Sequence, residues 1–129
     1  MLSYLSTLAG TIKAMTKRVS IAAQALEILE QLEVELKAAQ LWQAQPPSLQ
    51  ALQSTAPFAS DTLDFHQWLQ FILIPTMNQL VEQRAALPNA MAISPMAIEV
   101  WRGQLREHRQ IILQLKALDE LLDGHHARH

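Results

Sequence analysis

The segment 66–80, HQWLQFILIPTMNQL, is the most apolar stretch of the chain and carries a proline near its centre. The apolar run 71–74 comes directly before Pro75, where a helix or a strand would be most regular. At about 100° per residue, the apolar side chains of residues 65–73 cover an arc of about 200°. A half-buried strand would instead alternate apolar and polar residues. The pattern therefore predicts a helix that is enclosed by other helices.

Pro75 constrains this helix further. Proline lacks a backbone N–H and its ring clashes with the carbonyl four residues earlier, which here belongs to Phe71. The sequence therefore predicts a central helix kinked at Pro75. The kink has two interpretations. It is a feature of the core alone, or it frees the Phe71 carbonyl to line a pocket or contact a partner.

Apolar periodicity and helix-ending residues predict the other elements. A first helix over 19–44 has an apolar seam at spacings of three and four and ends before Pro46-Pro47. A single turn is expected over 48–52. The central helix should begin at Asp61 or Thr62 and reach residue 86.

Ser94-Pro95 is a strong helix start, with serine as N-cap and proline at the first helical position. It predicts a short helix that ends near Gln104. A last helix has its apolar face over 111–122 and should stop at Gly124. Together these elements predict an all-α, single-domain helical bundle of about four main helices.

Composition excludes several classes of protein. The chain has 129 residues, the length of one domain, and a formal charge of −2, whereas nucleic-acid-binding domains are usually basic. It has no cysteine, which excludes disulfides, thiolate metal sites and a cysteine nucleophile. No apolar run approaches the ~20 residues of a membrane-spanning helix, so no membrane association is expected.

The chain divides into a weakly patterned extension over 1–16, a helical domain over 17–123 and a histidine-rich tail over 124–129. The run 15–18, MTKR, resembles a natural start, so residues 1–14 are an added extension or an ordinary N-terminal turn of helix. Tail histidines bind divalent metals adventitiously. The sequence predicts no physiological metal and no cofactor.

One set of residues is a candidate binding site. Arg102, Arg106 and Arg109 share a helix face if the helix continues through Gly103, and Trp101 is adjacent. Such a face could hold phosphates while the indole stacks on a base. The alternative is a solvated face whose arginines pair with nearby glutamates. His66, on the polar sector of the central helix, is interpreted as a surface or rim residue rather than a general base.

The segment 61–77, DTLDFHQWLQFILIPTM, resembles the YqcC-like family of small bacterial proteins. The later motifs Leu87-Pro88 and 92–97, AISPMA, stand in the order and spacing of that family, and the resemblance covers residues 16–122. This sequence differs from the family pattern at Thr76, where an arginine is common, and at Ile98, where an acidic residue is common. The resemblance implies an all-helical cytoplasmic protein associated by gene neighbourhood with tRNA pseudouridine synthase C.

The family supplies no catalytic residues. Pseudouridine synthases resemble one another in a mixed α/β fold with a catalytic aspartate in a short strand motif. The nearest match here is residues 117–120, ALDE, within an amphipathic helix. We therefore expect a non-catalytic accessory protein with a protein partner, acting beside a tRNA-modifying enzyme. The alternatives are an RNA-binding module that uses the arginines on tRNA and an enzyme with an unrecognised pocket. Self-association is left open.

Overall fold

The computed structural model describes residues 21–127, with side chains through Asp123. The expected extension over 1–16 and the side chains of the tail lie outside this part. The described part is helical and has no strand, which confirms the all-α prediction. No helix within it is long and apolar enough to cross a membrane. The principal elements are α2 (Ile21–Ala38), α4 (Phe65–Trp68), α5 (Ile74–Glu82), α6 (Ile93–Val100) and α7 (Arg109–Ala127).

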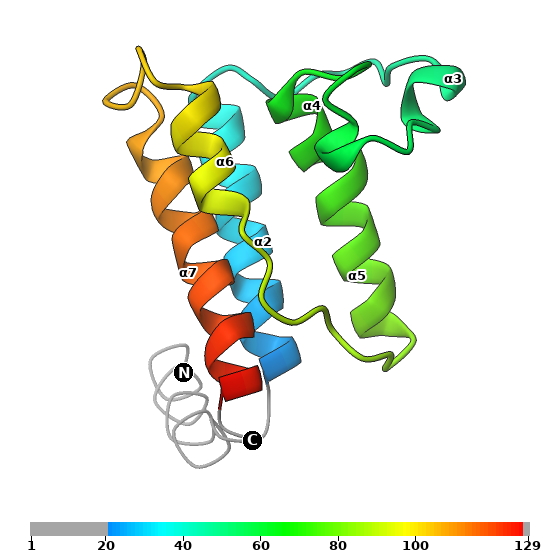
Figure 1. Ribbon diagram of the computed structural model, residues 1–129, viewed down its shortest axis with the longest axis vertical. Coiled ribbons are helices and arrows are strands. Elements are labelled where there is room, and N and C mark those ends of the chain that lie inside the picture. Colours follow the sequence, from blue (N-terminus) through cyan, green and yellow to red (C-terminus); the bar gives the residue numbers. More distant parts are fainter. Residues whose placement is uncertain (1–20, 128–129) are drawn as a thin grey trace, which may run out of the picture.

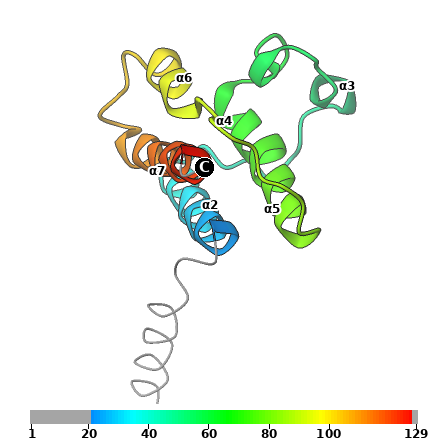
Figure 2. The same ribbon diagram turned by 60° about the horizontal axis from the view of Figure 1, so that its bottom comes forward.

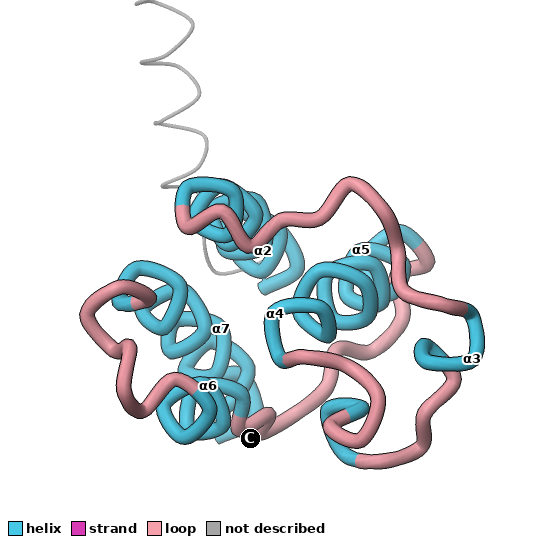
Figure 3. Tube along the Cα trace, turned by 90° about the horizontal axis from the view of Figure 1, so that it is seen from above, coloured by secondary structure: helices cyan, strands magenta, loops and turns pink. Residues whose placement is uncertain are grey.

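The helices form two groups (Figure 1). α2 and α7 lie side by side, and α6 packs along α7. α4 and α5 follow one another on the other side of the molecule, and α5 also contacts α2. A long connector with the short helix α3 (Leu49–Leu52) and the 3₁₀ turn η1 (Pro57–Ala59) runs along the outside of α4 (Figure 3).

A single apolar cluster joins the two groups. Leu32 and Leu36 on α2, Leu115 and Leu118 on α7, and Leu69 before α5 are all fully buried. The predicted seam of α2 is thus confirmed as core. Its main packing partner is α7 rather than the central helix, as Figure 2 shows from a second direction.

α2 ends at Ala38, about one and a half turns before the predicted end. The chain leaves the helix through Gln40, which has a left-handed φ of 62°. The N–H of Leu41 donates to the carbonyl of Leu36 at 2.9 Å, and that of Gln40 to Lys37 at 3.0 Å. This is the Schellman arrangement, usually built on glycine. No glycine marks it here, so the sequence carries no signal for this end.

The central helix begins at Phe65, a turn later than predicted. Asp64, not Asp61 or Thr62, precedes it, and the side-chain oxygen of Gln67 accepts from the Asp64 N–H at 2.8 Å. Thr62 instead donates its hydroxyl to the carbonyl of Ala51 at 2.7 Å, which ties η1 to α3.

The helix type changes near Pro75. Residues Leu69–Leu73 form a π-helical turn, η2, and α5 begins at Ile74 with Pro75 in its first turn. The N–H of Ile74 donates to the carbonyl of Leu69, five residues back. A π turn widens the helix directly before the proline. Helical geometry continues from Phe65 through Pro75 to Glu82, so the kink at Pro75 stays a prediction.

α6 begins at Ile93 with Ala92 as N-cap, so the prediction of Ser94 as N-cap is wrong. Its first N–H groups are instead satisfied from α7. The Asp119 carboxylate accepts from Ile93 at 3.1 Å and from Ser94 at 2.7 Å. α6 ends at Val100, and α7 continues past Gly124 to Ala127, so that glycine does not stop the last helix.

Candidate functional site

Trp101 lies in the core. It is 6% exposed and meets the ring of Phe65 edge-on, with centroids 5.3 Å apart. On its other side the His108 ring is 4.5 Å away. A base could stack on this indole only if these contacts opened. The expectation that Trp101 offers a stacking surface is therefore corrected: its large apolar area is used to join α6 to α4.

The three arginines do not share one helix face, because the chain leaves helical geometry between α6 and α7. Residues 101–108 form successive turns, and α7 starts only at Arg109. Arg102 donates to Glu99 at 2.7 Å, an ion pair between exposed side chains. That contact matches the solvated-face alternative. The assumption of a helix continuous through Gly103 is wrong, and phosphate binding by these residues stays a prediction.

Arg106 and Arg109 instead border a groove between α6 and α7. We call it the α6/α7 groove, and its volume is about 400 Å³. Its apolar lining includes Ile98 from α6 and Leu113 from α7, which are 43% and 44% exposed. Leu105, in the intervening turns, is 41% exposed. Lys116 completes the basic side of the groove. An open apolar floor beside cations suits a macromolecular contact better than a small-molecule reaction.

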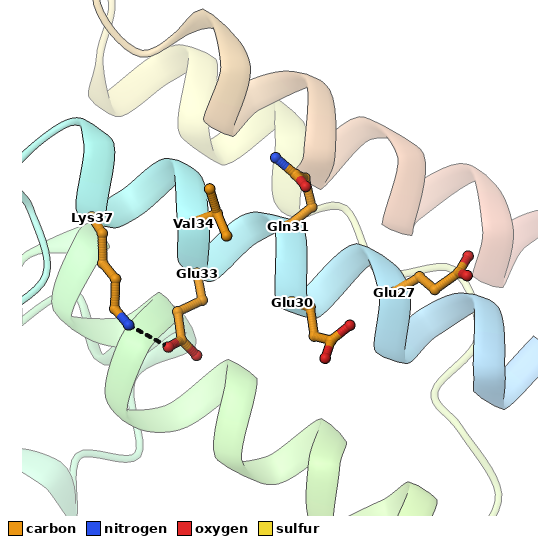
Figure 4. Close-up of a pocket in the computed structure, with 6 residues that line it drawn as sticks. All are labelled: Glu27, Glu30, Gln31, Glu33, Val34 and Lys37. Atoms are coloured by element: carbon orange, nitrogen blue, oxygen red, sulfur yellow. Dashed lines mark ion pairs between the residues drawn. The ribbon is translucent and has the colours of Figure 1, made fainter. Parts of the chain in front are cut away.

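A second hollow lies along α2, and Figure 4 shows its lining residues. Glu27, Glu30 and Glu33 follow one another along the helix, and Lys37 pairs with Glu33 at 2.8 Å. Neither this hollow nor any other part of the described chain brings together three or more side chains that could hold a metal ion.

His66 lies at the rim of the core, one of the two positions predicted for it. Its side chain is 20% exposed, and Nε2 lies 3.7 Å from the carboxylate of Asp64. Its Nδ1 atom is buried without a hydrogen-bond partner, as is that of His108. His66 therefore lies at the edge of the packed interior. The nearby Phe71 is half-buried and Pro75 is exposed.

Sequence reasoning missed two polar residues that fix the fold around these surfaces. Asp119, the nearest match to a catalytic aspartate, is occupied by the N–H groups of Ile93 and Ser94. Gln70, 6% exposed within η2, bonds both the N–H and the carbonyl of Gln43, at 2.9 and 2.8 Å. Gln70 falls in the polar sector of the central helix, outside the apolar arc, so periodicity gave no signal for its burial. No pattern in the sequence indicates the role of Asp119.

The described residues form a small all-helical domain. The chain belongs to the family described as DUF446, tRNA pseudouridine synthase C, whose model matches residues 24–121. The predicted membership in the YqcC-like family is thereby confirmed. The solution NMR structure of protein YqcC from Escherichia coli is similar, with a TM-score of 0.72 and 30% identity. That similarity covers 81% of this chain and 89% of the solved one.

Two relatives match along most of their length. An uncharacterized protein of Haemophilus influenzae is 40% identical over 78% of this chain and 94% of its own. The uncharacterized protein YqcC of Escherichia coli is 34% identical over 81% of this chain and 90% of its own. A third relative is matched over only a small part of its own length. The tRNA pseudouridine synthase C of Pectobacterium carotovorum is 31% identical over 67% of this chain, but the match spans 23% of that protein.

Proposed function

We propose that this protein is a non-catalytic cytoplasmic accessory protein that binds a tRNA pseudouridine synthase. The observation that carries the proposal is the Pectobacterium relative, in which the similar region is 23% of a protein named for that enzyme. The remainder of that protein is long enough to hold a separate catalytic domain. A domain that is joined to an enzyme in one organism is a good candidate to bind the same enzyme as a separate chain in another.

The description of the family names an enzyme, yet the geometry supports an accessory role. Asp119 is the nearest match to a catalytic aspartate, and its carboxylate caps α6 through two hydrogen bonds at 3.1 and 2.7 Å. A carboxylate that accepts two backbone N–H groups holds a helix in place and is poorly placed to attack a substrate. The exposed apolar side chains of the α6/α7 groove favour a protein as the binding partner.

The test is direct binding. The purified protein and the tRNA pseudouridine synthase of the same organism are treated with nuclease, mixed and measured by analytical ultracentrifugation. We expect a complex in the absence of RNA. Absence of a complex at concentrations of about 100 μM, which corresponds to binding weaker than about −5.5 kcal/mol, would contradict the proposal. A complex that forms only after tRNA is added would support the RNA-binding alternative instead.

A further inference from the structure

The α6/α7 groove is the surface whose composition most restricts what can bind to it. Its exposed apolar side chains Ile98, Leu105 and Leu113 come from three different segments and meet in one hollow, with buried Ile112 beneath them. Single exposed apolar residues are common on protein surfaces, whereas a group that shares a groove indicates a binding site. Covering this floor would remove apolar surface from water and would favour association.

The charge around this floor has one sign. Arg106, Arg109 and Lys116 line the groove, and no acidic residue of the described part of the chain does. None of these three cations forms an ion pair with another residue of the described part, in contrast to Arg102, which is held by Glu99. Lys116 also borders a neighbouring hollow that contains Asp119 and other acids. The two arginines are therefore the cations most available to a partner.

We propose that the α6/α7 groove binds an acidic amphipathic segment of the partner protein, and this inference rests on the proposed function above. Apolar side chains of that segment would cover Leu105 and Leu113. Its carboxylates would meet Arg106 and Arg109, whose planar guanidinium groups bind carboxylates through two parallel hydrogen bonds. Charge complementarity selects an acidic segment, and the apolar floor selects one with an apolar face.

Other occupants fit less well. Residues 1–20 of the chain contain Lys13, Lys17 and Arg18 and no acidic residue, so their charge would oppose that of the groove. An RNA backbone would satisfy the arginines, but it would place phosphates and sugars over an apolar floor. A second copy would have to offer an acidic surface of its own, such as that of α2. Joining that surface to this groove would repeat head to tail rather than close a dimer.

The experiment compares matched substitutions in the complex with the purified synthase. Leu113→Glu places a carboxylate on the groove floor, and the double variant Arg106→Glu/Arg109→Glu reverses the charge at its edge. The control for the first is Val34→Glu, because Val34 on α2 is 54% exposed and does not line the groove. The control for the second is Arg102→Glu. All five substituted positions are exposed, so far-ultraviolet circular dichroism should show wild-type helix content.

We expect each groove variant to weaken binding at least tenfold, about 1.4 kcal/mol, and each control to change it less than about twofold. If the wild-type protein forms no complex, the proposed function fails. If a complex forms and the groove variants bind as tightly as wild type, the groove inference fails while the proposed function stands. Equal losses for Arg102→Glu and the double variant, with a requirement for tRNA, would indicate RNA instead. Self-association that Leu113→Glu abolishes would show that a second copy covers the groove.

Discussion

Gln70 shows how one side chain can fix a long connector. It sits in η2 among buried leucines, and its amide makes a reciprocal pair of hydrogen bonds with the backbone of Gln43. The connector that follows α2 is thereby held against the central helix, 27 residues away in the sequence. An amide has both a donor and an acceptor, so it can satisfy an N–H and a carbonyl at once. A leucine of similar size could satisfy neither.

We therefore expect Gln70→Ala to lower the free energy of unfolding by about 1–3 kcal/mol, because the Gln43 backbone groups would lose their partners in a partly buried site. Urea denaturation measures the change. Gln79→Ala, an exposed position on α5, is the control and should cost less than about 0.5 kcal/mol. Equal effects at the two positions would mean that water replaces the Gln70 amide without loss.

At the scale of elements, α6 depends on α7 for its start. Eight residues are too few for a helix to be stable alone, and the Ala92 N-cap provides no side-chain hydrogen bond. The Asp119 carboxylate supplies that cap from another helix and also places negative charge at the positive end of α6. The position of α6, and with it one wall of the α6/α7 groove, follows from this contact.

Asp119→Ala should therefore cost about 1–2 kcal/mol of stability, the usual range for the loss of an N-cap. Asp119→Asn should lower the free energy of unfolding less than Asp119→Ala does, since the amide oxygen still accepts from one N–H. Thermal and urea denaturation of both variants give the comparison, with Glu120→Ala, which is exposed on the same helix, as the control. If Asp119→Ala and Glu120→Ala prove equally stable, α6 does not need this cap.

The helices were predictable from the sequence, whereas several of their ends and contacts were not. The seam of α2 and the arc of the central helix follow from periodicity, which records burial directly. Gln40 and Arg84 end α2 and α5 with left-handed φ values of 62° and 54°, positions that glycine normally occupies. Tertiary packing imposes these conformations, so they could not be predicted from the local sequence. The shared helix face of the three arginines was mispredicted for a related reason: the chain leaves helical geometry over 101–108, where Trp101 is buried in the core.

At the scale of the whole molecule, one apolar cluster takes in residues of α2, α4, η2, α5, α6 and α7. Phe65 and Trp101 join the α4 side to α6, while Met77 and Leu32 belong to the same buried cluster from α5 and α2. A shared core of this kind predicts one cooperative unfolding transition, because neither group of helices can lose its partner and keep its own apolar surface buried.

Leu32→Ala tests this view from the centre of α2. Leu32 is fully buried, so the substitution should cost about 2–5 kcal/mol. Val34→Ala, two residues along at a position 54% exposed, should cost less than about 0.5 kcal/mol. Circular dichroism reports all helices. In a Trp42→Phe background, which leaves Trp68 and Trp101 as the tryptophans, fluorescence reports the packing of α4 against α6. In a single cooperative unit, Leu32→Ala shifts both curves to the same lower midpoint. A fluorescence midpoint that stays in place while the circular dichroism midpoint falls would show that the α2/α7 pair unfolds independently of the α4–α6 packing, because the loss at Leu32 would then not reach the tryptophans.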